Sequence, residues 1–392
     1  FWFQLNEIKA GVGRPAEVPR ASFARIGILG AGMMGAGIAH ACATRGIDVV
    51  LKDVSQEAAD KGKAYSAKLL ARQLEKGRIT RDKHDATLAC ITPTASAADL
   101  AGCELVIEAV FEDRELKAHV TAEAEAQLEN NAIFASNTST LPITGLAAAS
   151  RQAANFIGLH FFSPAERMPL VEIICGRETS PQTLARSHDF VQQIGKTPII
   201  VNDSRGFFTS RVFGTFCNEG IAMLNEGVPA AAIENGALLA GFPVGPLAVS
   251  DEVSLTLMSK IRHQTIADLR AEGKEYTALR SESVIDWMLE QNRAGKAAGK
   301  GFYDYPQQGR KQLWPTLTTR FAHAEGLIPL LDIKERLLFV QAIETVRCVD
   351  EGVLTSSRDA NIGSIFGIGF PAWTGGVLQY INGYGLAEFV KH

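Results

Sequence analysis

Two residues of this sequence, His160 and Glu172, have the types needed for general acid–base chemistry and lie in successive apolar runs. A histidine exchanges a proton near neutral pH, and a carboxylate bonded to one ring nitrogen raises the basicity of the other. Because a glutamate is rarely buried without a partner, we predict that Glu172 pairs with His160. A satisfied core histidine and a purely structural ion pair remain open alternatives.

A glycine-rich turn after the apolar run 26–29 predicts a dinucleotide site. Its first glycine permits a tight turn, the second lets the backbone approach a pyrophosphate, and the third lets a helix pack on the strand. The helix expected over 36–45 would direct its free N–H groups at the phosphates. A glycine turn without a ligand is the alternative. The six residues are Gly30, Ala31, Gly32, Met33, Met34 and Gly35.

An acid at the end of the next apolar run indicates which dinucleotide binds. Asp53 follows the run 47–52 and lies 18 residues after Gly35. A carboxylate there accepts both ribose hydroxyls of adenosine and repels a 2′-phosphate. The sequence therefore favours NAD over NADP.

A polar segment, residues 136–139, directly follows the apolar run 132–135. Ligands of open α/β sheets bind at the carboxyl ends of parallel strands, so these side chains are candidate site residues. A helix N-cap, or a loop that satisfies its own backbone, is the alternative.

The elements that must position these residues alternate between short apolar runs and helical stretches from residue 25 to about 203. This pattern predicts an α/β fold, a Rossmann-type doubly wound parallel sheet. From residue 204 the pattern becomes mostly helical. The expected strands cover 25–29, 48–52, 105–109, 133–136, 156–161, 171–175 and 199–201.

The helical region contains an internal repeat. Residues 211–227 and 336–352 have equal length and both end in Glu-Gly, and each copy then reaches a Gly-Phe-Pro at 241–243 or 369–371. Two tandem related helical units are therefore expected. The predicted parts are a linker or remnant of a preceding domain (1–22), an NAD-binding domain (23–203), a first helical domain (204–305), a linker (306–329) and a second helical repeat (330–392).

Composition limits the function classes. The 392 residues suggest two or three domains, and a formal charge of −4 argues against nucleic acid or an anionic membrane as the main partner. No apolar run approaches the roughly 20 residues of a membrane-spanning helix. The six cysteines are scattered without a C-x-x-C pair, which fits reduced thiols in a cytoplasmic protein and predicts neither a metal site nor a disulfide frame.

Taken together, the chain resembles the (S)-3-hydroxyacyl-CoA dehydrogenase family of fatty-acid β-oxidation, and the similarity covers nearly everything from residue 24 onward. The doubled helical unit looks like that of multifunctional enzymes of this pathway, in which an enoyl-CoA hydratase domain precedes the dehydrogenase. Single-unit members dimerise through the helical domain, and a tandem unit would leave this chain monomeric. The runs that carry the resemblance are 30–39, 106–113 with Lys117, 136–139, 160–164 and 299–303.

The resemblance implies roles for individual positions. His160 matches the general base, and Glu172 matches its orienting acid. Ser139 matches a serine close to both the substrate oxygen and the nicotinamide. Three positions match residues that contact the cofactor: the ribose-binding Asp53, and Glu112 and Lys117.

Some positions depart from the family pattern. Ser210 replaces an asparagine that helps to hold the substrate carbonyl, and Ser163 replaces an asparagine near the nicotinamide. CoA is implied to cross between the domains, and the basic stretch that ends at Lys76 and Arg78 offers Lys76 as a phosphate partner. A solvated helix face explains that stretch equally well. Ala297 stands where a lysine is usual.

The predicted function is the NAD-dependent oxidation of an (S)-3-hydroxyacyl-CoA to the 3-ketoacyl-CoA, with His160 as the base. One alternative is a dehydrogenase of hydroxy acids without CoA, although such enzymes commonly use a lysine base on a helix. The other is a module that binds NAD(H) without turnover, an alternative kept open by Ser210.

Overall fold

Eight strands form one sheet in the order β3-β2-β1-β4-β5-β6-β7-β8. The structure is a computed structural model and describes residues 1–323 and 327–392. Neighbouring strands are parallel except β6 and β7. The predicted Rossmann-type sheet is confirmed. The strands are β1 (Arg25–Leu29), β2 (Asp48–Lys52), β3 (Ile91–Thr94), β4 (Leu105–Glu108), β5 (Ile133–Ser136), β6 (Phe156–Phe161), β7 (Leu170–Cys175) and β8 (Thr197–Asn202).

Two features of the sheet differ from the sequence prediction. Strand β3 was not expected, because it is short and contains Pro93, but it lies at the sheet edge, where a proline is tolerated. Strand β7 runs antiparallel to β6 instead of parallel. Only residues 162–169 connect the two strands, and a parallel crossover needs a dozen or more residues.

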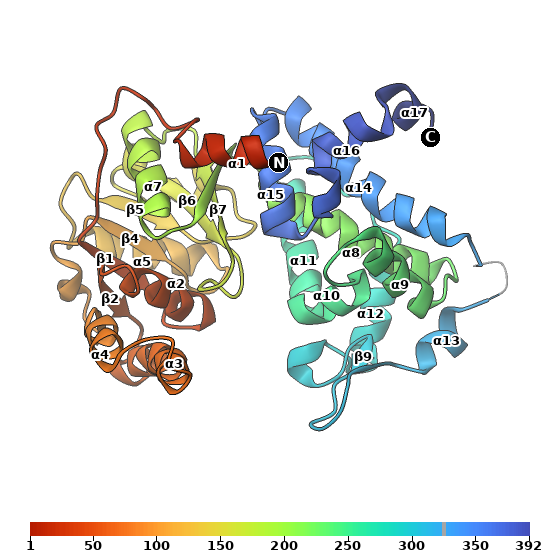
Figure 1. Cartoon of the computed structure of the whole chain (residues 1–392), viewed down its shortest axis with the longest axis horizontal. Coiled ribbons are helices and arrows are strands. Elements are labelled where there is room, and N and C mark those ends of the chain that lie inside the picture. Colours follow the sequence, from red (N-terminus) through yellow and green to blue (C-terminus); the bar gives the residue numbers. More distant parts are fainter. Residues whose placement is uncertain (324–326) are drawn as a thin grey trace. The chain divides into compact units, whose positions relative to one another are not determined.

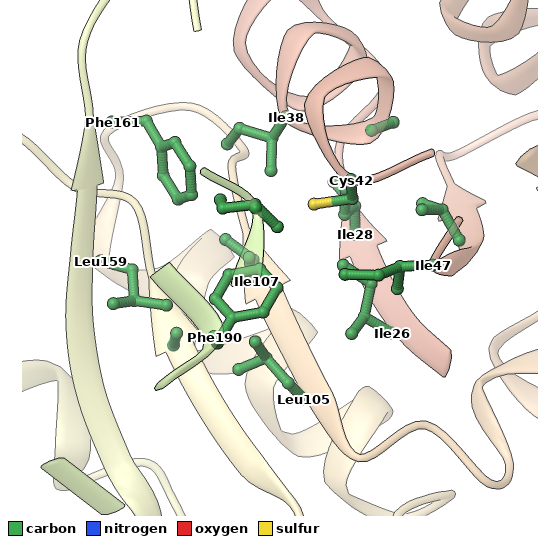
Figure 2. Packing of buried hydrophobic residues seen from close by; sticks show 14 of the residues in the cluster. Ile26, Ile28, Ile38, Cys42, Ile47, Leu105, Ile107, Leu159, Phe161 and Phe190 are labelled. Carbon is green, nitrogen blue, oxygen red and sulfur yellow. The ribbon is translucent and has the colours of Figure 1, made fainter. Parts of the chain in front are cut away.

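Helices around the sheet complete the core of the first unit (Figure 1). Figure 2 shows Ile38 and Cys42 of α2 and Phe190 of α7 directed toward strand residues such as Ile28 and Ile107. All five side chains are fully buried. The helices are α1 (Trp2–Lys9), α2 (Met33–Ala43), α3 (Gln56–Glu75), α4 (Arg81–Ala89), α5 (Arg114–Glu125), α6 (Ile143–Ala147) and α7 (Pro181–Gln193), with 3-10 turns η1 (Ala97–Leu100) and η2 (Ala153–Asn155).

The remaining residues are mostly helical, as predicted. The two copies of the repeat appear as the long helices α8 (Thr209–Asn225) and α14 (Leu330–Asp350). Arg336 of α14 donates to Glu219 and Glu226 of α8, each at 2.6 Å. The other elements are α9 (Ala230–Ala240), α10 (Pro246–Val253), α11 (Leu255–Ala271), α12 (Glu282–Glu290), η3 (Lys296–Ala298), β9 (Tyr303–Asp304), β10 (Gln312–Leu313), α13 (Thr316–Phe321), α15 (Ser357–Ile368), η5 (Ala372–Thr374), α16 (Val377–Tyr384) and α17 (Leu386–Lys391).

The chain divides into two compact units. The first holds Phe1–Thr209 with Val349–Gly367, and the second holds Ser210–Cys348 with Ile368–His392. The domain limits expected from the sequence stay a prediction. The segment expected as a linker at 306–329 contains β10 and α13. Within the described part of the chain, no helix combines the length and apolar character needed to cross a bilayer.

The segment before β1 is fixed to the first unit by a buried ion pair. Arg14 donates to both carboxylate oxygens of Asp189 on α7, at 2.7 and 2.8 Å, and its side chain is 5% exposed. Arg20 donates to the same carboxylate at 2.9 Å. His188 lies beside this cluster with an unpartnered buried Nδ1 atom, and burial lowers its pKa to about 4.

Replacing His188 by leucine is expected to reduce the loss in the free energy of unfolding as the pH falls. The folded pKa lies below the usual value of 6.5, so as the pH falls the unfolded chain takes up the proton first. Stability is therefore lost between about pH 6.5 and pH 4, by up to about 3 kcal/mol. Urea unfolding at a series of pH values measures this effect, with the exposed His263→Leu as control. Equal acid sensitivity of the wild type and His188→Leu would contradict this prediction.

Candidate active site

The structure brings His160 and Glu172 together across the antiparallel pair β6 and β7. They are directly opposite in the strand register, and His160 Nδ1 lies 2.9 Å from Glu172 Oε2. Glu172 is fully buried, and His160 is 7% exposed. The imidazole packs against the ring of Phe162, with centroids 4.5 Å apart. The antiparallel register produces this contact, because each residue faces one partner on the next strand.

Four donors converge on the Glu172 carboxylate. Oε1 accepts the backbone N–H groups of Phe208 and Thr209 at 3.1 and 3.0 Å, and Oε2 accepts the Thr209 hydroxyl at 2.5 Å besides the His160 ring. Four donors match the lone pairs of an ionised carboxylate. His160 therefore carries its proton on Nδ1, and Nε2 keeps the lone pair that can accept another proton.

The glycine turn has the geometry of a dinucleotide site. Gly30 has φ 90 and donates its N–H to the Lys52 carbonyl at 2.8 Å, which closes the turn onto β2. A Cβ on Gly35 would lie 1.7 Å from the Gly30 carbonyl oxygen, so α2 packs against the turn only because residue 35 is glycine. A Cβ on Gly32 would meet no heavy atom within 4 Å. That open surface lies at the N-cap of α2, which has no side-chain cap, and it fits the close approach of a diphosphate.

Asp53 stands beside this turn, at the end of β2. Its Oδ2 accepts the Ala31 N–H at 2.6 Å, and its Oδ1 accepts the Val54 N–H at 2.7 Å. These bonds hold the carboxylate next to the turn, where the ribose of an adenosine is expected. Met33, also on the turn, is 67% exposed, and Ser163 Oγ lies 3.8 Å from its sulfur. Met34 is partly buried against the core.

A charged network follows the ends of β4 and β5. Lys117 donates to Glu108 Oε1 at 2.7 Å and lies 3.2 Å from Glu112 Oε2. Glu112 Oε1 accepts the N–H of Ser139 at 2.7 Å and its hydroxyl at 3.2 Å. Glu108 Oε2 accepts the Ser136 hydroxyl at 2.8 Å. The network joins Ser139 to Glu112 and Lys117, three residues that the sequence analysis selected.

Two further residues were selected from the sequence, Lys76 and Ser210. Lys76 is exposed at the C-cap of α3. Ser210 follows Thr209 in the chain and is the first residue of the second unit. Their contacts with a substrate remain predictions. Among the described residues, no group of three His, Cys, Asp or Glu side chains is arranged to hold a metal ion.

Sequence reasoning missed two participants, Thr209 and Glu108. Thr209 bonds Glu172, and Glu108 anchors Lys117. Asn137 belongs to the candidate segment 136–139, and its side-chain oxygen accepts the Phe161 N–H at 2.8 Å next to His160. Glu108 could have been found from the sequence, because it is a glutamate at the end of an apolar run. Glu172 was selected on the same ground, since it lies within an apolar run. The contacts of Thr209 and Asn137 had no such signal, because they join segments far apart in the sequence.

Comparison with known proteins identifies the family. The model of the 3-hydroxyacyl-CoA dehydrogenase NAD binding domain matches residues 25–204, and that of the 3-hydroxyacyl-CoA dehydrogenase C-terminal domain matches residues 206–305. The chain belongs to the 3-hydroxyacyl-CoA dehydrogenase family. It is an oxidoreductase, and NAD is its cofactor.

Solved structures of the family resemble the chain over different lengths. The (S)-3-hydroxybutyryl-CoA dehydrogenase of Ralstonia eutropha is 36% identical with a TM-score of 0.67, over 73% of this chain and 100% of that one. The dehydrogenase part of multifunctional enzyme 1 of C. elegans is 25% identical with a TM-score of 0.65, over 94% of this chain and 86% of that one. The 3-hydroxybutyryl-CoA dehydrogenase of Escherichia coli K12 shares the fold at 22% identity, with a TM-score of 0.80 over 95% and 93% of the two chains.

Proposed function

We propose that this dehydrogenase oxidises the hydroxyl group of an (S)-3-hydroxyacyl-CoA to a 3-ketoacyl-CoA, as a step of fatty-acid β-oxidation. The observation that carries the proposal is the contact of His160 Nδ1 with Glu172 Oε2 at 2.9 Å. A proton placed on Nδ1 by this carboxylate leaves Nε2 as a proton acceptor on the NAD-binding domain. The bound NAD supplies a hydride acceptor. The protein contributes a base and a hydrogen-bond donor to the reacting substrate oxygen, and it holds both in position.

In this proposal each residue has one task. His160 Nε2 takes the hydroxyl proton in oxidation and returns it in reduction. Glu172 holds the ring in the tautomer that can do so. Ser139 donates to the reacting oxygen: its hydroxyl bond to Glu112 is long, at 3.2 Å, and a substrate oxygen can replace it. Ser210 and Lys76 are proposed to hold the carbonyl and a CoA phosphate.

Three further proposals concern the setting of the reaction. A hydratase domain is proposed to precede the dehydrogenase in the whole protein, and the match to the dehydrogenase part of a multifunctional enzyme supports the presence of a further enzyme domain. The (S)-3-hydroxybutyryl-CoA dehydrogenase at 36% identity supports a CoA thioester as substrate. Six free cysteines support a cytoplasmic location.

An assay in the direction of reduction tests the proposal. NADH absorbance is followed with acetoacetyl-CoA, and in parallel with free acetoacetate and with NADPH. We expect turnover only with NADH and the thioester. Turnover of free acetoacetate would favour the alternative of a dehydrogenase that needs no CoA. NADH binding without any turnover would favour a non-catalytic module and would contradict the proposal.

A further inference from the structure

We propose that Thr209 is a positioning residue that sets the proton affinity of His160 through the carboxylate they share. The inference rests on the proposed function of His160 and deepens it. Thr209 is fully buried and begins helix α8. No role for it followed from the sequence.

The contacts of Thr209 reach both oxygens of Glu172. Its backbone N–H donates to Oε1 at 3.0 Å, and its hydroxyl donates to Oε2 at 2.5 Å. Oε2 is the same oxygen that accepts His160 Nδ1 at 2.9 Å. The hydroxyl oxygen also lies 3.4 Å from Nδ1, so the three groups form a closed cluster.

Two donors on one oxygen compete with each other. A hydrogen bond to a carboxylate is charge-assisted, and each donor withdraws electron density from the oxygen it binds. Without the hydroxyl, Oε2 would be a stronger acceptor for the His160 N–H. A stronger acceptor stabilises the protonated ring, because an opposite charge and a hydrogen bond both favour the charged form. The Thr209 hydroxyl therefore keeps His160 from holding its proton too tightly.

The other groups that face the imidazole support this view. Strand β7 contributes the Glu172 carboxylate. The rings of Phe162 and Phe207 approach to 4.5 and 6.3 Å between centroids and are uncharged. The start of α8 contributes the Phe208 N–H to Oε1. Among these groups, the hydrogen-bond donors on Glu172 therefore act on the proton affinity of the His160 ring.

The position of the hydroxyl is fixed by the backbone before it. Phe207 has φ 51, a left-handed turn that brings the next two N–H groups onto Oε1. These N–H groups belong to the unsatisfied first turn of α8, so the carboxylate serves as its cap. Because backbone and hydroxyl of Thr209 bind one carboxylate, the side chain has little freedom to turn away.

The experiment removes the hydroxyl and follows the pH dependence. Thr209→Ala removes the donor, Thr209→Ser restores it, and Thr345→Ala removes another buried threonine hydroxyl, which bonds the Gln341 carbonyl within α14. For Thr209→Ala we expect the acidic limb of kcat/KM for oxidation and the basic limb for reduction both to move to higher pH. The rate of oxidation on the acidic limb should fall about 3–10-fold, a typical effect of one hydrogen bond. Thr209→Ser and Thr345→Ala should follow the wild type.

A second readout does not depend on turnover. The ring-proton signal of His160, assigned by its loss in His160→Gln, is titrated by NMR in the cofactor-free protein. Its midpoint should move to higher pH in Thr209→Ala and not in Thr209→Ser. Should Thr209→Ala not fold, as judged by near-ultraviolet circular dichroism, Thr209→Val keeps the volume and takes its place.

The outcomes separate the two proposals. Superimposable pH profiles and ring titrations of wild type and Thr209→Ala would overturn the role of Thr209. A moved ring titration in a protein that turns over no acyl-CoA would leave that role standing and overturn the proposed function. A general loss of rate with unmoved limbs would mean that Thr209 is merely structural.

Discussion

Replacement of His160 by glutamine is expected to lower kcat by roughly 10²–10⁴-fold, the range of general acid–base catalysis. Glutamine has a side-chain amide that can still donate to Glu172 Oε2, so the buried carboxylate keeps a partner there. The amide does not accept a proton near neutral pH. The rate should therefore fall because the proton has no acceptor, while the fold remains.

The measurement compares steady-state rates with NADH binding followed by fluorescence titration. NADH affinity should stay close to wild type, since His160 lies on β6 whereas the glycine turn follows β1. His263→Gln, an exposed position on α11, is the matched control and should keep the full rate. A rate of His160→Gln within threefold of wild type would show that another group takes the proton.

Replacement of Gly35 by alanine should be the most damaging single methyl group in the nucleotide turn. Its Cβ would lie 1.7 Å from the Gly30 carbonyl oxygen and 2.9 Å from the Gly30 carbonyl carbon. Both are backbone atoms, so no side chain can move aside. We expect a loss of about 3 kcal/mol or more in the free energy of unfolding, together with loss of measurable NADH binding.

Gly32→Ala is the matched variant, because it adds the same methyl group where the protein leaves space. Residue 32 has φ −66 and ψ −170, which alanine adopts freely, and its Cβ would meet nothing within 4 Å. Stability should change by less than about 0.5 kcal/mol. NADH affinity should nevertheless fall at least about tenfold, since the methyl group occupies the predicted path of the pyrophosphate. Wild-type affinity of Gly32→Ala, measured by titration beside a thermal melt, would mean that the diphosphate does not pass over Gly32.

Local sequence patterns predicted several strands and the first helix of the nucleotide site. The strand ranges 25–29, 48–52, 133–136 and 156–161 were predicted as the structure has them, because each is a short apolar run bounded by turns or helices. Helix α2 begins at Met33, three residues before its predicted start, because the last glycine of the motif lies inside the helix. The turn and its helix are made by residues close in sequence, so the dinucleotide site could be predicted from the sequence.

Pairing between distant segments was harder to read. The direction of β7 depends on the length of one connection, and β3 is a short edge strand with a proline. The pairing of His160 with Glu172 was inferred from chemistry alone, since a buried glutamate needs a partner. Its one-to-one register came only from the antiparallel arrangement.

The sequence by itself determined the α/β class, the NAD-type turn with Asp53, and the residues capable of proton chemistry. These follow from local periodicity, from glycines that local geometry requires, and from residue types. Only the tertiary structure decided that Thr209 and the Phe208 N–H converge on Glu172, and that Glu108 anchors Lys117. Such contacts join residues 9 to 37 positions apart through sheet register and one helix start. Their positions depend on how many weak packing interactions are satisfied together, which no single stretch of sequence specifies.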